Sequence, residues 1–293
     1  MYMKRFKPSA EAAEKKQQEA LELLEQGIQQ LTETDNWQQY LRVQSCFHRY
    51  SFKNVVMILF QCPEATRVAG YRAWQGMGRQ VRQGEKAIAI LAPIMRQVDD
   101  VETGEKARRL AGFKCSSVFD VSQTEGDELP EIYTSLQGDD AGLLKQLEDF
   151  ATGLNIRVRF EGCLGASGRC MWFADGHIEI AVDSLLPKLH QCKTFAHELG
   201  HALMHSEQDY RQHTSKSQLE LEAESVAFMV LNHFGLDSGG YSFAYVAHWS
   251  GGAEAAIAQI QESGRRIQAA AHQIIDWIET QQSPAMELGL VAA

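Results

Sequence analysis

The residues most able to do chemistry form an H-E-x-x-H motif of His197, Glu198 and His201. In a helix, residues four apart lie on one face a turn apart, so the two imidazoles can bind one divalent metal ion. Zinc is the usual occupant of this motif, and another divalent ion is possible. Glu198 lies beside the histidines, where its carboxylate can take a proton from water. The motif therefore predicts a metal-dependent hydrolytic centre with Glu198 as its catalytic group.

A catalytic zinc ion takes three protein ligands, so the two histidines need a partner. Gln218–Leu231 can supply it, because this segment holds strong helix formers and three glutamates. Glu220 and Glu224 are four residues apart and share a helix face, whereas Glu222 points elsewhere. We expect Glu220 to be the ligand, Glu224 to hydrogen-bond a ligand histidine and Glu222 to meet water. The reverse assignment of Glu220 and Glu224 stays open.

The same motif could instead be a charged helix face that only meets water. Two features favour a metal site. Phe195 and Leu199 give the motif helix an apolar side to bury, and the glutamate helix follows nineteen residues after His201. With that site filled, three further histidines are expected not to be ligands: His190, His205 and His213. Three later side chains could donate a hydrogen bond during catalysis, although packing is the favoured interpretation: Tyr241, Tyr245 and His248.

Composition bounds the type of protein. The chain has 293 residues, of which 44% are hydrophobic and 23% charged, as in ordinary globular proteins of one or two domains. Its six cysteines form no C-x-x-C pair and no signal peptide precedes them, so we expect reduced thiols and a cytoplasmic protein. The longest apolar runs are too short to span a bilayer, so no membrane role is expected.

Charge is unevenly distributed along the chain. The net charge is −10, but residues 1–130 carry 18 basic and 17 acidic side chains, whereas residues 131–293 carry 10 and 21. Residues 40–98 hold nine basic and two acidic side chains. A local basic patch attracts phosphates even when the total charge is negative. The first part of the chain is therefore the candidate for binding nucleic acid.

Aromatic and basic residues interleave in this basic region. Cations can follow phosphates while aromatic rings stack on unpaired bases, which favours single-stranded DNA over duplex. The alternative is that Phe52 and Trp74 belong to the core and the cations form a solvated rim. The aromatic residues are Tyr50, Phe52, Tyr71 and Trp74, and the basic ones are Arg49, Lys53, Arg67, Arg72, Arg79, Arg82 and Lys86.

Periodicity predicts an α+β chain of two domains, residues 1–130 and 131–293, with an acidic linker within 121–137. The first is expected to contain helices at 9–32, 36–48 and 52–62, a short helix at Tyr71–Gly76, and strands at Lys86–Met95 and 107–121. The second is expected to contain a helix near 139–152, strands at Ile156–Phe160, Arg169–Phe173 and His177–Val182, the motif and glutamate helices, and a final helix near 253–281. His177–Val182 is expected to be the strand beside the motif, with a free edge that holds an extended peptide.

Two sets of segments carry a resemblance to known families. HELGHALMH and ELEAESVAF are similar to gluzincin-type metallopeptidases, including the ImmA/IrrE-like group. YSFKN (50–54), ATRVAGYRAWQGMGRQV (65–81) and GEKAIAILAPI (84–94) resemble the N-terminal domain of ArdC-type antirestriction proteins of conjugative plasmids. The resemblance implies a domain that binds single-stranded DNA, followed by a zincin-like metallopeptidase domain. It makes seven residues candidate DNA contacts: Tyr50, Phe52, Asn54, Arg67, Trp74, Arg79 and Lys86. Arg82, a cation of the same basic region, is an eighth candidate.

Two main functions follow as hypotheses. In the first, the protein binds single-stranded DNA and protects incoming plasmid DNA from host restriction, with the zinc domain as a protease or an appendage. In the second, it is a regulatory zinc metalloprotease that cleaves a host restriction enzyme or regulator, and DNA binding only localises it. A binding protein whose zinc domain lacks protease activity is the third possibility.

Overall fold

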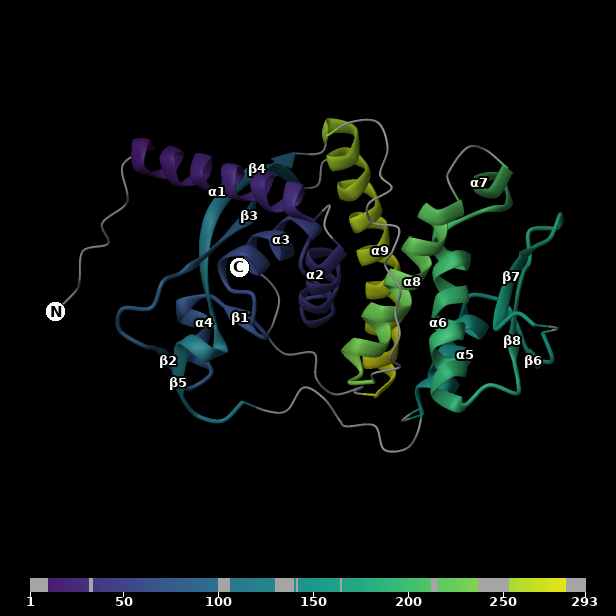
Figure 1. Cartoon of the computed structure of the whole chain (residues 1–293). Helices are drawn as coiled ribbons and strands as arrows, with labels where there is room; N and C mark the ends of the chain where they lie inside the picture. Colours follow the sequence, from purple (N-terminus) through teal and green to yellow (C-terminus); the bar gives the residue numbers. More distant parts are fainter. Residues whose placement is uncertain are drawn as a thin grey trace. The chain divides into compact units, whose positions relative to one another are not determined.

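A computed structural model describes residues 10–31, 34–99, 106–129, 140, 142–163, 165–211, 216–236 and 253–282 (Figure 1). The fold mixes helices and strands, so the predicted α+β class is confirmed. Among the described residues, two compact units separate. One unit contains Lys53–Leu129 together with the chain up to Ile28, and the other contains Gln29–Phe52 together with the chain from Pro130. Each unit is described by itself below.

The first unit is built around a long antiparallel hairpin. Strands β3 (Ile88–Asp99) and β4 (Lys106–Asp120) pair along most of their length, with a bulge at Ile94/Met95. The sheet has the order β1-β4-β3, and β2 and β5 form a separate pair. The other elements are α1 (Ala10–Gln30), α3 (Phe52–Gln61), β1 (Val68–Ala69), α4 (Tyr71–Gly76), β2 (Arg79–Val81), η1 (Val121–Gln123) and β5 (Thr124–Gly126).

Two amide side chains of α3 cover the outer edge of β3. Asn54 Nδ2 donates to Leu91 O at 3.0 Å, and Leu91 N–H donates to Asn54 Oδ1 at 2.8 Å. Gln61 repeats this pair with Ala89, at 2.9 Å in both directions. The amides thus take the place of a neighbouring strand, which protects an edge from pairing with other chains.

The second unit carries the motif helix on a small mixed sheet. Strands β6 (Arg157–Glu161) and β8 (Ile178–Asp183) are parallel, and β7 (Gly168–Trp172) is antiparallel to β8, in the order β6-β8-β7. Its helices are α2 (Thr34–Cys46), α5 (Leu143–Gly153), α6 (Lys188–Met204), α7 (Glu207–Arg211), α8 (Lys216–His233) and α9 (Ala253–Gln282). The prediction that His177–Val182 has the free edge was wrong. That segment is the central strand, because it pairs with a neighbour on each side.

Helix α2 packs on α8, although nearly 190 residues separate them in sequence. Trp37 is buried and its Nε1 donates to Ser225 Oγ at 3.2 Å, while Asn232 Nδ2 donates to Ser45 Oγ at 2.6 Å. His233 Nδ1 pairs with Ser45 O at 2.8 Å. Residues 29–52 therefore cluster with the second unit, which is a difference from the predicted division at 1–130 and 131–293.

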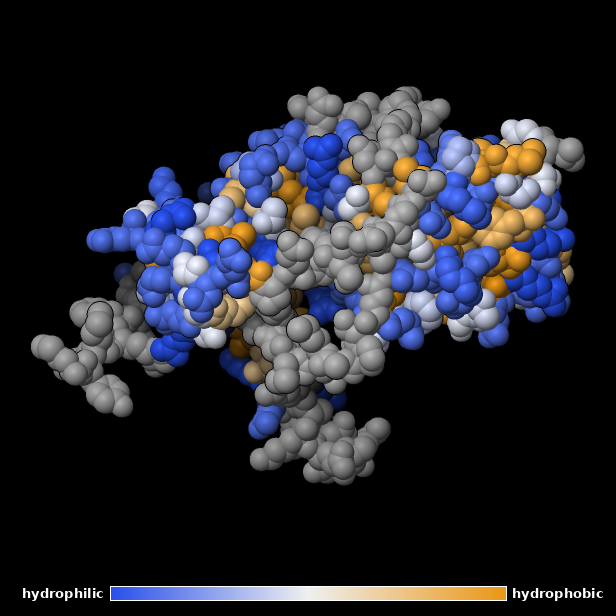
Figure 2. All heavy atoms as spheres, turned by 90° about the horizontal axis from the view of Figure 1, so that it is seen from below, coloured by the Kyte–Doolittle hydropathy of each residue, from blue (hydrophilic) through white to orange (hydrophobic). Residues whose placement is uncertain are grey.

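The described surface is mixed in character. On the face shown in Figure 2, hydrophobic patches lie between hydrophilic side chains. Among the described helices, none is both long and apolar enough to cross a membrane. All six cysteines lie in the described part of the chain and are free thiols, with Cys163 and Cys192 buried.

Candidate metal centre

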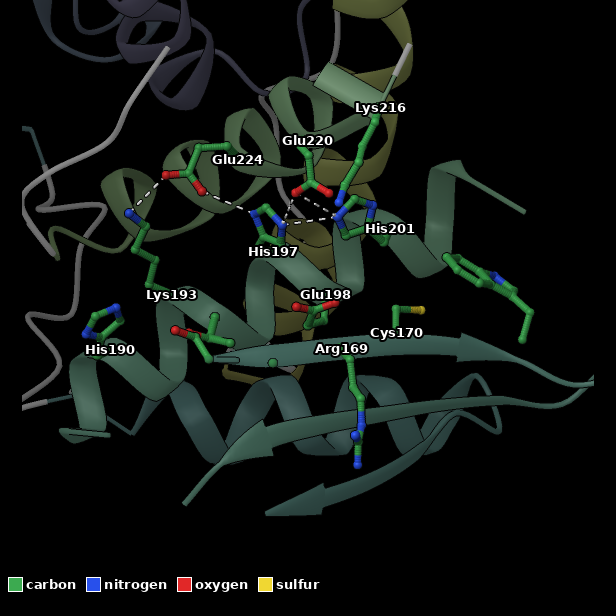
Figure 3. Close-up of a pocket in the computed structure, with 14 residues that line it drawn as sticks. Arg169, Cys170, His190, Lys193, His197, Glu198, His201, Lys216, Glu220 and Glu224 are labelled. Atoms are coloured by element: carbon green, nitrogen blue, oxygen red, sulfur yellow. Dashed lines mark hydrogen bonds and ion pairs between the residues drawn. The ribbon is translucent and has the colours of Figure 1, made fainter. Parts of the chain in front are cut away.

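Three potential ligand atoms converge between α6 and α8. His197 Nε2 and His201 Nε2 lie 3.1 Å apart, and Glu220 Oε2 lies 3.3 Å and 3.6 Å from them (Figure 3). Ligands at about 2.0–2.1 Å around a tetrahedral zinc ion are separated by roughly 3.4 Å, which these distances bracket. Two ring nitrogens and a carboxylate oxygen facing one another are a donor set suited to a divalent cation. The structure thus brings the three predicted ligands together.

Close approach of the two helices makes this convergence possible. Gly200 lies between the histidine turns of α6, and a Cβ atom there would meet Ala223 Cα at 3.1 Å and Ala223 O at 3.3 Å. Both contacts are with the backbone of α8, which cannot move aside as a flexible side chain can. Glycine at this position therefore lets α8 bring Glu220 against the histidines.

His197 is oriented through its second ring nitrogen. His197 Nδ1 donates to Glu224 Oε2 at 3.1 Å, and Lys193 Nζ pairs with the other oxygen of Glu224 at 2.9 Å. A proton on Nδ1 leaves the lone pair of Nε2 directed at Glu220 and His201. The structure thus places Glu220 and Glu224 in the positions that we expected. Lys193, four residues before His197, was not predicted, although its helical spacing indicated the same face.

His201 is oriented by a longer chain of hydrogen bonds. Its Nδ1 lies 2.9 Å from His205 Nδ1, and His205 Nε2 lies 2.9 Å from Glu222 Oε2. A carboxylate only accepts, so His205 Nε2 carries the proton and its Nδ1 accepts from His201. The lone pair of His201 Nε2 is then free for a cation. The hydrogen bond from His205 to His201 was not predicted, although the spacing of four residues between them indicated that they share a helix face.

The prediction that Glu222 meets water was wrong. Its side chain is fully buried, because α9 covers the face of α8 that bears it. From α9, Ser263 Oγ donates to Glu222 Oε1 at 2.6 Å and Arg266 Nη1 lies 3.4 Å from Oε2. The helical spacing placed Glu222 on a different face of α8 from Glu220, as the structure has it. The local sequence contains no signal that α9, forty residues later, covers that face.

The Glu198 side chain extends from α6 toward the edge strand β7. Its carboxylate is buried and accepts a hydrogen bond from the Cys170 backbone N–H. A Cβ atom at Gly168 would lie 2.9 Å from Glu198 Oε1, so glycine there leaves room for the carboxylate. Burial raises the pKa of Glu198 to about 7, with His197 opposing the shift and the charge of Glu220 adding to it. A carboxylate with a pKa near neutrality is suited to general-base catalysis.

The same neighbours perturb the three ligand candidates. Burial lowers the pKa of His197, but hydrogen bonds with Glu220 and Glu224 outweigh it and raise that pKa to about 9. Hydrogen bonds from His197 and His201 hold the pKa of Glu220 far below its usual range. Burial lowers the pKa of His201. A proton on His197 and a cation between the three donors therefore compete for the same lone pair.

A pocket of about 610 Å³ opens onto these residues. Strand β7 forms one wall, through Gly168, Arg169, Cys170 and Trp172, and α6 and α8 form the other. In Figure 3 the Arg169 side chain extends away from the histidines, and His190 lies at the far end of α6 from His201. Four residues weighed above lie outside the described part of the chain: His213, Tyr241, Tyr245 and His248.

The two large rings among the predicted DNA contacts are core residues. Phe52 is 1% exposed and lies against α9, where a Cβ atom at Gly264 would clash with its ring. Trp74 is 2% exposed, packs with Ala69 and Val81, and donates from Nε1 to Phe119 O at 2.9 Å. Neither ring offers a face to a base in this structure. Tyr50 is partly buried with its ring edge against Phe47, and burial raises its pKa.

The polar candidates divide into structural and exposed groups. Asn54 holds the edge of β3, as described above. Arg79 donates from Nε to Thr124 Oγ1 at 2.8 Å and also pairs with Asp127 O, so it links β2 to β5. Arg82 pairs with Glu85 at 2.9 Å. Lys86 is exposed and Arg67 is partly buried.

Two aromatic rings that were not among the predicted DNA contacts are exposed in the structure. Tyr71 is 43% exposed and Phe113 is 48% exposed. Tyr71 was included among the interleaved aromatics but not among the DNA contacts, and Phe113 was not singled out. Phe113 follows Gly112 in a strand whose other apolar residues nearby, such as Leu110, are also exposed. Its position in a strand gave no signal of exposure, because the face covered by helices depends on tertiary packing.

Comparisons with known proteins agree on the two parts of the chain. Residues 10–119 match the family described as the N-terminal domain of anti-restriction factor ArdC, and residues 151–231 match the IrrE N-terminal-like domain of the peptidase M78 family. An uncharacterized protein of Bacillus anthracis is 25% identical over 243 residues, which cover 70% of this chain and 41% of that relative. This chain therefore spans less than half the length of that relative.

Two crystal structures of the antirestriction ArdC protein from the R388 plasmid are also similar. The metal-free form is 25% identical, with a TM-score of 0.49, and the Mn(II)-bound form is 22% identical, with a TM-score of 0.47. Each match covers 78% of this chain and 85% of the other. The two family matches follow one another without overlap, so the chain has the two-domain organisation of an ArdC-type protein, with an ArdC N-terminal domain at residues 10–119 followed by an IrrE-like domain at residues 151–231.

Proposed function

We propose that this protein is an antirestriction factor with a divalent-metal-dependent peptidase site in its second unit and a surface for single-stranded DNA in its first. The observation that carries the peptidase proposal is the convergence of His197, His201 and Glu220, with Glu198 buried beside them. The donor set supports zinc, and another divalent ion would use the same atoms. The proposal covers cleavage of peptide bonds and leaves the identity of the protein substrate open.

The residues of the proposed metal centre would share this reaction between them. A divalent cation held by His197, His201 and Glu220 would supply Lewis acidity and make water more acidic. Glu198 takes the proton of the attacking water and later gives it to the departing amine. Glu224 keeps His197 in the required tautomer, and the His205–Glu222 pair does the same for His201.

Strand β7 can hold an extended peptide next to these groups. Phe173 N–H donates to His177 O at 3.0 Å, which continues the pairs that Arg169 and Met171 form with β8. In an antiparallel ladder, the residues between these direct their N–H groups away from β8, toward the other edge of β7. The bond from Cys170 N–H to Glu198 agrees with this direction. The amide of Gly168 therefore faces the edge of β7 that does not pair with β8, where a substrate backbone could pair with it.

Variants at two carboxylates test the peptidase proposal. Full-length wild-type, Glu198→Gln and Glu220→Gln proteins would be loaded with Zn²⁺ or Mn²⁺, assayed for metal content, and incubated with a library of unstructured peptides. We expect the wild type to cut peptides, Glu198→Gln to retain its metal without cutting, and Glu220→Gln to lose both. His190→Gln is the control, since this side chain lines the pocket away from the donors. Wild-type cleavage by Glu198→Gln would contradict the assigned role.

The first unit supports binding of single-stranded DNA through exposed side chains. Lys53, Arg72 and Lys86 are exposed cations within the basic region. Tyr71 and Phe113 are the exposed aromatic rings among the described residues of this unit, and rings of this kind can stack on unpaired bases. The DNA surface that we propose therefore uses Tyr71 and Phe113 for stacking, with exposed cations for the phosphates. Trp74 belongs to the core of this unit and is not part of the proposed surface.

Anisotropy titrations with matched single-stranded and duplex oligonucleotides, at two salt concentrations, test this surface. We expect single-strand preference with affinity falling as salt rises, because bound phosphates release counterions. Arg72→Glu/Lys86→Glu should weaken binding at both salts, and Tyr71→Ala should cost about 1–3 kcal/mol. Arg157→Glu/Arg265→Glu is a control of equal charge change on exposed side chains of the second unit. Equal affinity for single strands and duplex would contradict the stacking proposal.

The open strand edge supports a second candidate, a regulatory protease that acts on a host or plasmid protein. A plasmid-transfer assay into a restricting host separates the two. Protection that survives Glu198→Gln but not Arg72→Glu/Lys86→Glu assigns antirestriction to DNA binding. Loss of protection with Glu198→Gln assigns it to cleavage of a protein.

A further inference from the structure

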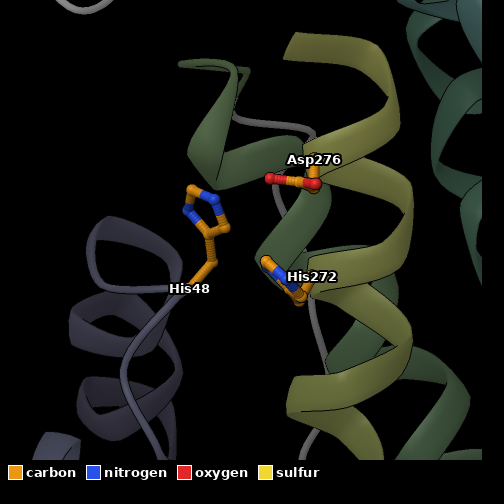
Figure 4. A group of neighbouring side chains, drawn as sticks. All are labelled: His48, His272 and Asp276. Atoms are coloured by element: carbon orange, nitrogen blue, oxygen red, sulfur yellow. The ribbon is translucent and has the colours of Figure 1, made fainter. Parts of the chain in front are cut away.

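A second group of histidine and carboxylate side chains lies in the second unit, apart from the pocket. His48 follows α2, and His272 and Asp276 lie one turn apart on α9 (Figure 4). The His48 ring points toward α9 and stacks on His272, with ring centroids 5.4 Å apart and planes inclined by 30°. One nitrogen of each histidine and one oxygen of Asp276 lie within 4.8 Å of one another.

His48 is an unusual core residue. It is 7% exposed, yet neither of its ring nitrogens has a hydrogen-bond partner among the described residues. Nδ1 of His272 is also buried and lacks a partner. A buried polar atom without a partner costs about 1–3 kcal/mol, so such atoms call for an explanation. A cation bound to one nitrogen of each ring would satisfy two of these three atoms, with the Asp276 carboxylate as its third ligand.

We propose that His48, His272 and Asp276 form a second divalent-metal site, whose chemistry fits Zn²⁺. Two imidazole nitrogens and one carboxylate oxygen are ordinary zinc ligands, and a water molecule completes the coordination of such three-ligand sites. The Asp276 side chain is 44% exposed, and binding the ion requires it to turn away from Arg49. The site is independent of the peptidase proposal, because it shares no residue with the pocket.

Two charged side chains lie close to this group. Glu279 Oε2 lies 3.7 Å from His48 Nε2, which is beyond hydrogen-bond distance. Arg49 is the main competitor, since its Nη2 lies 2.9 Å from Asp276 Oδ1 and 3.1 Å from Glu279 Oε2. Glu279 can retain Arg49 when Asp276 turns to the cation.

A neighbouring combination of His48, His233 and Glu279 is a weaker alternative. Both nitrogens of His233 already have partners, Ser45 O at 2.8 Å and Glu279 Oε1 at 3.1 Å. Binding a metal there would break a hydrogen bond within the structure, whereas the His48–His272–Asp276 group offers nitrogens that lack partners. The metal in the favoured group would fasten the segment after α2 to α9. Gln268 Nε2 already holds this segment through His48 O at 3.1 Å.

Zinc binding by the full chain tests the second site. In a His197→Ala/His201→Ala background, which removes the pocket donors, isothermal titration with Zn²⁺ should still show one bound ion. Asp276→Asn and His272→Gln in this background should weaken binding at least about tenfold, the loss that even residues outside the ligand sphere can cause. Glu262→Gln is the control, because this exposed acid of α9 pairs with Arg265 and lies outside the group, so it should leave the affinity unchanged.

Stoichiometry gives a second measurement that does not depend on that background. Metal analysis after dialysis should give two Zn²⁺ per wild-type chain, one for Asp276→Asn and two for Glu279→Gln. No bound zinc in the double-histidine variant, together with one ion in wild type, would overturn the proposal. Loss of the second ion in Glu279→Gln but not in Asp276→Asn would also overturn it, by moving the ion to the other group.

Discussion

Each ligand histidine of the pocket is oriented through its outer nitrogen by a different route. His197 uses one carboxylate, Glu224, which is also neutralised by Lys193. His201 uses a second histidine, His205, whose other ring nitrogen is held by the buried Glu222. The second route places a negative charge farther from the metal, where Arg266 and Ser263 compensate it. Both routes end by freeing one lone pair for the cation.

This arrangement predicts that Glu222 affects metal binding although it is not a ligand. Glu222→Gln and Glu224→Gln should each lower zinc affinity by about 10–100-fold, because each weakens the bond that fixes a ligand tautomer. Competition with a chelating dye would measure the affinities, and circular dichroism would confirm that the variants fold. Glu207→Gln, an exposed acid on α7, serves as the control. Wild-type zinc affinity in Glu222→Gln would contradict the relay through His205.

Thiol chemistry provides a second prediction for single residues. Burial raises the pKa of Cys192 to about 12, with the charge of Asp140 adding to the shift. The reactive thiolate is therefore scarce at pH 8, and its fraction grows only as the pH approaches that value. Iodoacetamide at pH 8 should leave Cys192 unmodified in the native protein and modify it after unfolding, as peptide mass spectrometry would show. Rapid labelling of native Cys192 would contradict its burial.

At the scale of elements, features that depend on residue spacing could be predicted from the sequence, whereas features that depend on tertiary packing could not. The i, i+4 positions of His197 and His201, and the helix face of Glu220 and Glu224, follow from local geometry, so the sequence was sufficient for them. The central position of β8 and the cover over Glu222 depend on segments far apart in the chain. Trp74 and Phe52 show the same limit, because an aromatic residue that stacks on a base and one that fills a core have the same local sequence signal.

The contact of α6 with α8 gives a prediction at this scale. Gly200→Ala places a Cβ atom against the backbone of Ala223, so the helices must separate and withdraw Glu220 from the histidines. We expect a loss of about 1–3 kcal/mol in stability, together with weaker zinc binding. Gly153→Ala is the matched control, since a Cβ atom there meets nothing within 4 Å. Thermal unfolding with and without zinc measures both effects, and equal behaviour of the two variants would contradict the close approach.

For the whole molecule, the division into two units could not be predicted from the composition of successive parts of the chain. Residues 131–293 carry ten basic and 21 acidic side chains, which explains why DNA binding is assigned to the earlier part. Composition could not show that residues 29–52 cluster with the later part. That association rests on Trp37 and Ser45, whose partners Ser225, Asn232 and His233 lie on α8. Such long-range pairs have no periodic signal in one sequence.

A fragment cut at the predicted boundary should therefore be unstable. Residues 131–293 alone lack α2, whose Trp37, Tyr40 and Leu41 are each 0% exposed. Burial of such side chains contributes about 1.5–3 kcal/mol each, which together is comparable with the whole stability of about 5–15 kcal/mol of an ordinary protein. We expect this fragment to melt at a much lower temperature than one in which residues 29–52 are joined to 131–293 by a Gly-Ser linker. Circular dichroism would compare them, and equal melting temperatures would show that the later part folds without α2.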